Sequence, residues 1–178
     1  MLDRGSPTSP SKDFMVSRVF DAPRELVWRA FTEPQPMQGW FGPTGTAIIA
    51  ATMDLRPGGT YHYGMRTPDG GAMWGKFVYR EIDAPRQLVW VHSFSDEGGG
   101  ITRHPLSASW PLEMLTTVTF DEPLDGQTGV TIRWSPINAT QAEQKTFDAG
   151  HDSMRQGWGG TLDRLASYLA TENAVSEH

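Results

Sequence analysis

The chain has 178 residues and a formal net charge of −6, from 15 lysines and arginines against 21 aspartates and glutamates. This length fits one domain with a sizeable hydrophobic core. Because the charged residues form no basic run, the acidic balance argues against a nucleic-acid-binding surface. The chain contains no cysteine, which excludes disulfides, thiolate metal sites and a cysteine nucleophile.

No stretch reaches the roughly 20 apolar residues that span a bilayer, and the N-terminus has no apolar segment of the signal-peptide kind. We therefore expect a soluble, cytoplasmic protein that contacts neither membrane nor nucleic acid. Aromatic residues are the unusual part of the composition, with seven tryptophans, eight phenylalanines and four tyrosines. Each large ring buries about 150–250 Å², so most of them are expected in the core.

The N-terminal region predicts a tail, a strand and two short helices. Residues 1–12 are rich in serine, proline and charge, and we expect them to be a disordered tail. Residues 14–21 alternate apolar and other side chains, which predicts a strand. Pro23 suits the first turn of a helix that Asp21 caps, and a short helix is expected over residues 36–40.

Six further strands follow, and the turns between them are short. They are expected over residues 46–55, 60–66, 73–82, 88–94, 112–120 and 130–135. Turn sequences such as RPGG and PDGG between them predict antiparallel hairpins. Residues 95–111 are the exception, a long glycine-containing loop that we interpret as a candidate lid. Its Arg103 and His104 are candidates to contact an anionic ligand at a cavity mouth.

Residues 141–170 predict one long amphipathic helix. Its apolar stripe consists of Phe147, His151, Met154, Trp158, either Thr161 or Leu162, Leu165 and Leu169. Glycines at 157, 159 and 160 each lower helix stability by about 0.8–1 kcal/mol relative to alanine, which predicts a close approach of this helix to the sheet. We place the single domain at residues 13–171 and a C-terminal tail at 172–178.

Several motifs, found between about residues 14 and 170, carry a family resemblance. They are FDAPRELVWRAFTEP, WFGP, DLRPGGTYHYGM, PDGG, EIDAPRQLVW, TVTF and GWGGTLDRLASYL. On these motifs the chain resembles the activator of heat-shock-protein-90 ATPase homologue-like branch of the START/SRPBCC (Bet v 1-like) superfamily. The resemblance implies an α+β helix-grip fold, in which a curved antiparallel sheet wraps around a long C-terminal helix and two short helices follow the first strand. It also implies a deep cavity between the sheet and the last helix.

The candidate cavity residues come from the strands and the last helix. They are Tyr61, Tyr63, Trp74, Trp90, His92 and Phe94 from the strands, and His151, Met154 and Trp158 from the helix. These residues combine aromatic area with polar tips, as small-molecule pockets do. The alternatives are that the aromatic residues are ordinary sheet core and that His151 is a core histidine bonded to a backbone carbonyl. A phase error of one residue in a strand would send a side chain to the opposite face.

Motifs for common chemistries are missing from the sequence. No HxH or HxxxH spacing appears, so we expect no metal ion, and we expect no cofactor. No GxSxG motif occurs, which disfavours an α/β-hydrolase, and we identify no catalytic residues.

The leading hypothesis is a binding protein for a small apolar or aromatic molecule. One alternative is a cyclase- or hydrolase-like enzyme acting in the same cavity. The other is a co-chaperone-like interaction module, which is less favoured because the eukaryotic co-chaperone joins this domain to a separate chaperone-binding domain. We expect a monomer or a homodimer.

Overall fold

A computed structural model describes residues 13–176, and the tail predicted over residues 1–12 lies outside the described residues. A first strand is followed by two short helices, further strands and two C-terminal helices. The elements are β1 (Phe14–Phe20), α1 (Arg24–Thr32), α2 (Pro34–Trp40), β2 (Ala47–Met53), β3 (Thr60–Arg66), β4 (Ala72–Asp83), β5 (Gln87–Ser95), β6 (Ile101–Thr102), β7 (Met114–Asp121), β8 (Thr128–Pro136), α3 (Gln141–Ala149) and α4 (His151–Ser176).

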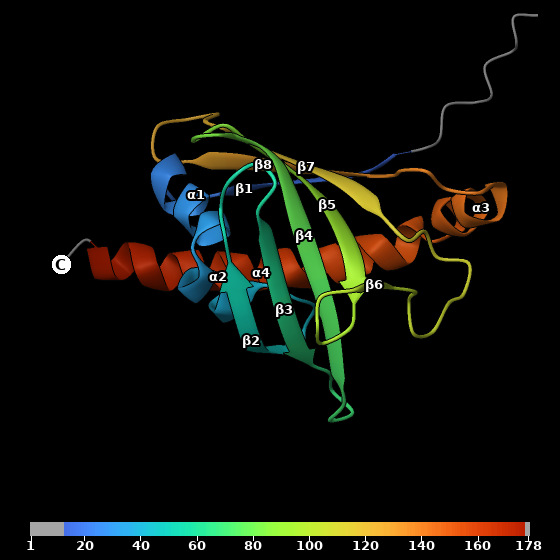
Figure 1. Ribbon diagram of the computed structural model, residues 1–178. Helices are drawn as coiled ribbons and strands as arrows, with labels where there is room; N and C mark the ends of the chain where they lie inside the picture. Colours follow the sequence, from blue (N-terminus) through green and yellow to red (C-terminus); the bar gives the residue numbers. More distant parts are fainter. Residues whose placement is uncertain (1–12, 177–178) are drawn as a thin grey trace, which may run out of the picture.

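The strands form one antiparallel sheet in the order β1-β8-β7-β5-β4-β3-β2, and the short β6 pairs with β5. Most consecutive strands pair as hairpins because their connections are short. β1 instead pairs with β8, so the first and the last strand are neighbours in the sheet. α4 crosses the inner side of the curved sheet, and α1 and α2 pack against α4 (Figure 1). The predicted helix-grip fold is confirmed.

One cross-strand row shows how the alternation of side chains builds the inner face. Tyr79, Trp90, Thr116, Trp134 and Phe14 are successive register partners in β4, β5, β7, β8 and β1. Four of these five side chains are buried and the fifth, that of Trp134, is partly buried. Because alternate residues of a strand share a face, the neighbouring rows also point inward. The inner face of the sheet is therefore largely aromatic.

The start of α1 differs from the prediction. The helix begins at Arg24 with Pro23 at the N-cap position, and no side chain caps it. Asp21, predicted as the cap, instead accepts a hydrogen bond of 2.9 Å from the side-chain amide of Gln127. The turn that holds Asp21 is thus fixed by the segment leading into β8 rather than by α1.

The predicted single C-terminal helix is two helices, because the chain breaks at Gly150. α3 begins with a capping box, in which Thr140 and Glu143 each bond the other's backbone N–H. It ends at Gly150, where an added Cβ would lie 3.3 Å from the carbonyl oxygen of Thr146 and 3.4 Å from the Trp110 ring. Such contacts leave little room for a side chain. α4 then continues to Ser176, past the boundary predicted at residue 171.

The glycines of α4 do not all behave as predicted. At Gly160 an added Cβ would lie 2.9 Å from the hydroxyl oxygen of Thr44, so a close approach exists there, but to the segment after α2 and not to the sheet. At Gly157 and Gly159 nothing lies within 4 Å of the Cβ position. The prediction that these two glycines permit tight packing is wrong. Within residues 13–176, no helix is long and apolar enough to cross a membrane.

Truncation of Leu162 tests whether α4 packs against the sheet as described. The side chain of Leu162 is 0% exposed, so Leu162→Ala should lower the free energy of unfolding by about 2–5 kcal/mol, as other buried leucine truncations do. Ser167→Ala, at an exposed position of the same helix, should change it by less than about 0.5 kcal/mol. Urea unfolding followed by tryptophan fluorescence measures both. Equal effects of the two substitutions would contradict the packing described for α4.

Candidate functional site

A cavity of about 700 Å³ lies between the inner face of the sheet and the helices α3 and α4. This volume is within the range of small-molecule sites, about 300–1,000 Å³. The cavity is lined by Phe41, Gly42 and Pro43 after α2, by Tyr63, Met65, Met73, His92, Ser93, Phe94, Met114 and Trp134 of the sheet, by His104, Trp110, Pro111 and Leu112 of the loop before β7, and by Thr146, Ala149, Gly150, Ser153, Met154, Gly157, Trp158 and Thr161 of the helical region.

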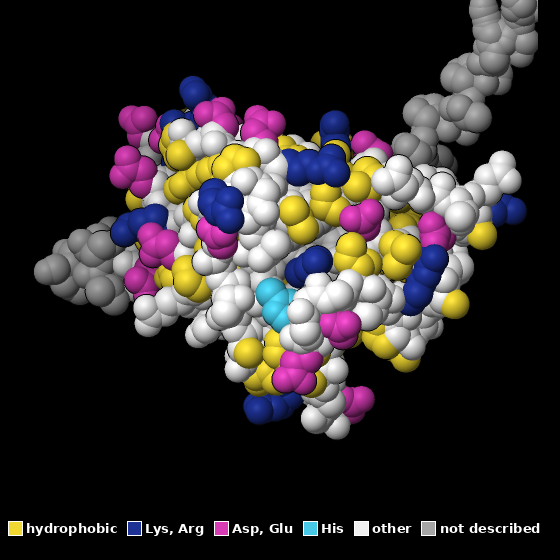
Figure 2. Space-filling view, in the orientation of Figure 1, with side chains coloured by type: hydrophobic (Ala, Val, Ile, Leu, Met, Phe, Trp, Pro, Cys, Tyr) yellow, Lys and Arg dark blue, Asp and Glu magenta, His cyan; other side chains and the backbone are white. Residues whose placement is uncertain are grey.

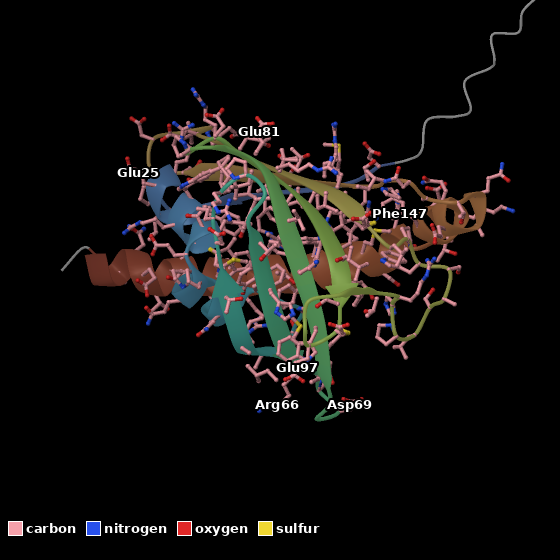
Figure 3. All side chains as sticks on the ribbon, viewed as in Figure 1. Glu25, Arg66, Asp69, Glu81, Glu97 and Phe147 are labelled. Atoms are coloured by element: carbon pink, nitrogen blue, oxygen red, sulfur yellow. The ribbon has the colours of Figure 1, made fainter. Side chains whose placement is uncertain are left out.

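The cavity wall carries no formal charge from acidic or basic side chains. Among the described residues, no aspartate, glutamate, lysine or arginine lines it. Figure 3 shows the labelled charged side chains, Glu25, Arg66, Asp69, Glu81 and Glu97, at the periphery of the molecule, and all five are exposed. The wall is instead built from aromatic rings and methionines, with a few hydroxyl and imidazole groups.

Two polar side chains of the wall, Tyr63 and His92, form a pair. The Tyr63 hydroxyl and Nε2 of His92 are hydrogen-bonded at 2.8 Å. The Tyr63 ring stacks on Tyr61 at 5.3 Å between centroids and meets Phe41 edge-on at 5.4 Å. Its position also requires Gly75, the register partner of Tyr63 in β4, because an added Cβ there would lie 2.6 Å from Cζ of Tyr63. The phenol ring of Tyr63 therefore lies over the backbone of Gly75, which has no side chain, and its hydroxyl reaches His92 of β5.

Burial keeps this pair uncharged. It lowers the pKa of His92 to about 4, so the imidazole is neutral at physiological pH. Burial, with a smaller contribution from Tyr61, raises the pKa of the Tyr63 hydroxyl above its usual value. Burial also lowers the pKa of His104 at the other side of the cavity. At neutral pH the wall therefore offers hydrogen bonds without charge.

The loop before β7 closes one side of the cavity and is fastened to α3. Arg103 forms an ion pair with Glu143, and its guanidinium also donates to the carbonyl of Trp110 at 3.3 Å. The hydroxyls of Ser109 and Thr146 are 2.8 Å apart. The hydrogen bond from Arg103 lowers the pKa of the Glu143 carboxyl. Arg103 is therefore held by Glu143 and does not line the cavity as a receptor for an anion.

Five of the predicted cavity residues line the cavity. They are Tyr63, His92, Phe94, Met154 and Trp158. The alternation of β3 and β5 and the spacing of α4 were sufficient to find them, because each projects from the face of its element that meets the other layer. Trp158 additionally packs edge-on against Trp134 at 5.6 Å.

The other four predicted residues lie elsewhere. Tyr61 and Trp90 belong to the buried core and do not line the cavity. Trp74 is on the opposite face of β4, where its ring stacks on His62 at 5.1 Å, since Gly75 and Phe77 set the inward phase of that strand. His151 packs edge-on against Phe14 and Phe147. We correct these four assignments: two are core, one is outward, and one packs beside the cavity.

Several lining residues are not among those predicted from the sequence. Met65 shares the inward face of β3 with Tyr63, so the alternation already indicated it. Trp134 follows from the same rule in β8. Trp110 comes from an irregular loop, where no periodicity marks the inward side chains. Gly157 was interpreted as a packing position, although it leaves open space at the cavity.

Comparisons with known proteins agree with this fold. The model of the family described as Activator of Hsp90 ATPase homolog 1-like protein matches residues 21–170. A crystal structure of a protein from Nitrosomonas europaea is 25% identical, with a TM-score of 0.71 over 93% of this chain and 98% of that one. A protein from Mycobacterium smegmatis is 24% identical, with a TM-score of 0.70 over 88% and 90%, and one from Silicibacter pomeroyi is 18% identical, with 0.69 over 90% and 99%. No curated protein matches the chain.

The lowered pKa of the partly buried His92 predicts a pH dependence of stability. Its pKa is about 4 in the folded protein and about 6.5 in an unfolded chain. The unfolded chain therefore binds a proton more readily between these values, so the free energy of unfolding falls as the pH falls from about 6.5 to 4, by at most about 1.4 kcal/mol per pH unit. Above pH 6.5 this contribution is constant. Urea unfolding at several pH values should show the slope in the native sequence.

His92→Gln provides the control, because other groups also titrate in this window. The difference in free energy of unfolding between the native protein and His92→Gln should shrink or reverse as the solution is acidified. A difference that stays constant between pH 7 and pH 4 would show that His92 is not buried as described.

Proposed function

Because the chain belongs to the family of Activator of Hsp90 ATPase homolog 1-like proteins, we propose that it is a small ligand-binding protein whose site is the cavity between the sheet and α4. The observation that supports this proposal is the cavity itself, about 700 Å³ in volume with a wall of aromatic rings and methionines. A concave apolar site with a few oriented polar groups is the usual form of a small-molecule site. An apolar or aromatic molecule suits this wall.

An enzymatic role is the second candidate, and one observation favours it. Tyr63 and His92 are hydrogen-bonded at 2.8 Å and both line the cavity, and such a pair can relay a proton to or from a bound molecule. The two candidates differ in the fate of the ligand. A molecule recovered unchanged from the protein supports binding, whereas conversion that Tyr63→Phe abolishes supports an enzyme.

The surface does not favour an interaction module. Large exposed hydrophobic residues of the described chain lie in four segments: Met15 and Val19 on β1, Ile49 on β2 at the opposite edge of the sheet, Ile101, Leu106 and Leu112 on β6 and in the loop before β7, and Leu124 in the turn before β8. On the face shown in Figure 2, hydrophobic side chains are interspersed with charged ones of both signs. A docking surface for another protein would be expected to form a more continuous apolar patch.

The proposal is tested with N-phenyl-1-naphthylamine, an uncharged dye whose emission increases in apolar surroundings. We expect saturable binding to the native protein, with a change in tryptophan emission because Trp110, Trp134 and Trp158 line the cavity. Gly157→Leu should weaken binding by at least about tenfold, or 1.4 kcal/mol. The new side chain has open space at the cavity and would fill it.

Gly159→Leu is the matched control. Gly159 also has nothing within 4 Å of its Cβ position but does not line the cavity. Both substitutions replace glycine, which is less favourable in a helix than alanine by about 0.8–1 kcal/mol, with a good helix former, so thermal unfolding should show both variants folded. No dye binding to the native protein, or equal binding to the two variants, would refute the cavity as the site.

A further inference from the structure

We propose that the cavity selects uncharged molecules that carry one oxygen function, such as a ketone, alcohol or phenol, and that the Tyr63–His92 pair holds this oxygen. This inference rests on the proposed function and specifies the ligand class of the same site. Three features of the described residues support it: the uncharged wall, the engagement of the nearby arginines, and the construction of the pair over Gly75.

The wall has no partner for a charged ligand. No aspartate, glutamate, lysine or arginine lines it among the described residues. Transfer of a carboxylate from water into such surroundings is strongly unfavourable unless a cation or several donors compensate it. A carboxylate ligand would therefore lose affinity relative to an uncharged molecule of the same shape.

Arg103 and Arg164 lie next to segments that line the cavity, and both guanidiniums are already bonded to other groups of the protein. Arg103 is paired with Glu143. Arg164 donates from Nη1 to the carbonyl oxygens of Gly42 and Pro43, both at 3.0 Å. Both guanidiniums hold the backbone of lining segments, at Trp110 and at Gly42 and Pro43. Neither is itself a lining residue.

The Tyr63–His92 pair can serve a ligand oxygen in either of two ways. If Tyr63 donates its proton to Nε2 of His92, the phenol oxygen keeps lone pairs that accept from a ligand hydroxyl. If His92 carries its proton on Nε2 and donates to Tyr63, the phenol O–H is free to donate to a ligand carbonyl. The pair therefore suits neutral donors and neutral acceptors. It offers no net charge in either arrangement.

The surrounding residues fix the position of the Tyr63–His92 pair. Tyr63 is only 7% exposed, and its ring is fixed by Tyr61 and Phe41. The bare backbone of Gly75 gives the phenol the space to cross β4 toward His92. Gly75 is thus a positioning residue for the hydroxyl, although it does not itself line the cavity.

The test uses three molecules of similar shape in competition with N-phenyl-1-naphthylamine at pH 7.5: 2-acetylnaphthalene, 2-ethylnaphthalene and 2-naphthoate. In the native protein the ketone should bind at least about tenfold more tightly than the carboxylate. Tyr63→Phe should reduce the preference for the ketone over the hydrocarbon by roughly two- to twelvefold, the value of one neutral hydrogen bond. Gly75→Ala should reduce the same preference by displacing the hydroxyl.

Tyr61→Phe is the matched control. Tyr61 stacks directly on Tyr63 but does not line the cavity, so its loss should leave the ketone preference unchanged. Equal affinity for ketone and carboxylate, or equal ketone preference in Tyr63→Phe and Tyr61→Phe, overturns the inference while dye binding still supports the proposed function. Failure of the native protein to bind the dye and all three molecules overturns both.

Discussion

The structure depends on how α4 covers the inner face of the sheet, and this cover is tight along only part of the helix. Toward its C-terminal part, Leu162, Leu165 and Leu169 are buried in the core. Toward its N-terminal part, Gly157 presents no side chain and nothing lies within 4 Å of its Cβ position. The neighbouring Met154 and Trp158 are buried and line the cavity together with Gly157. The cavity therefore lies in front of this part of α4, where glycine adds no side chain to fill the space.

The absence of charge in the cavity follows from how the surrounding loops are held. The loop before β7 and the segment after α2 each present backbone carbonyls to an arginine side chain. Arg103 and Arg164 supply these bonds from outside the wall. The same interactions that close the cavity therefore keep the guanidiniums out of it, and the polar character of the wall is left to the Tyr63 hydroxyl, the imidazoles of His92 and His104, the indole N–H groups of the lining tryptophans and a few hydroxyls.

Sequence patterns predicted the fold well because the strand alternation, short turns and helical stripe each reflect one buried face. They predicted the site residues only in part. In β3 and β5 the alternation is unambiguous, and Tyr63, His92 and Phe94 line the cavity as expected. In β4 the large ring of Trp74 suggested the inward face, but its neighbour Gly75 points inward, because an inward glycine carries no apolar side chain to reveal the phase. His151 lies on the apolar stripe of the C-terminal helices but packs beside the cavity. An apolar stripe shows which side of a helix is buried, but it does not show which residues that side contacts.

Two glycines with opposite surroundings explain why the site is formed as it is. At Gly75 an added Cβ would meet the Tyr63 ring, so glycine there is a steric requirement of the polar pair. At Gly157 an added Cβ would meet nothing, and glycine lowers helix stability by about 0.8–1 kcal/mol relative to alanine. Packing therefore gives no reason for glycine at 157, and at this lining position the missing side chain adds to the volume of the cavity. One glycine places the hydrogen-bonding group and the other preserves the volume in front of the helix, so the cavity combines an apolar body with a fixed polar end.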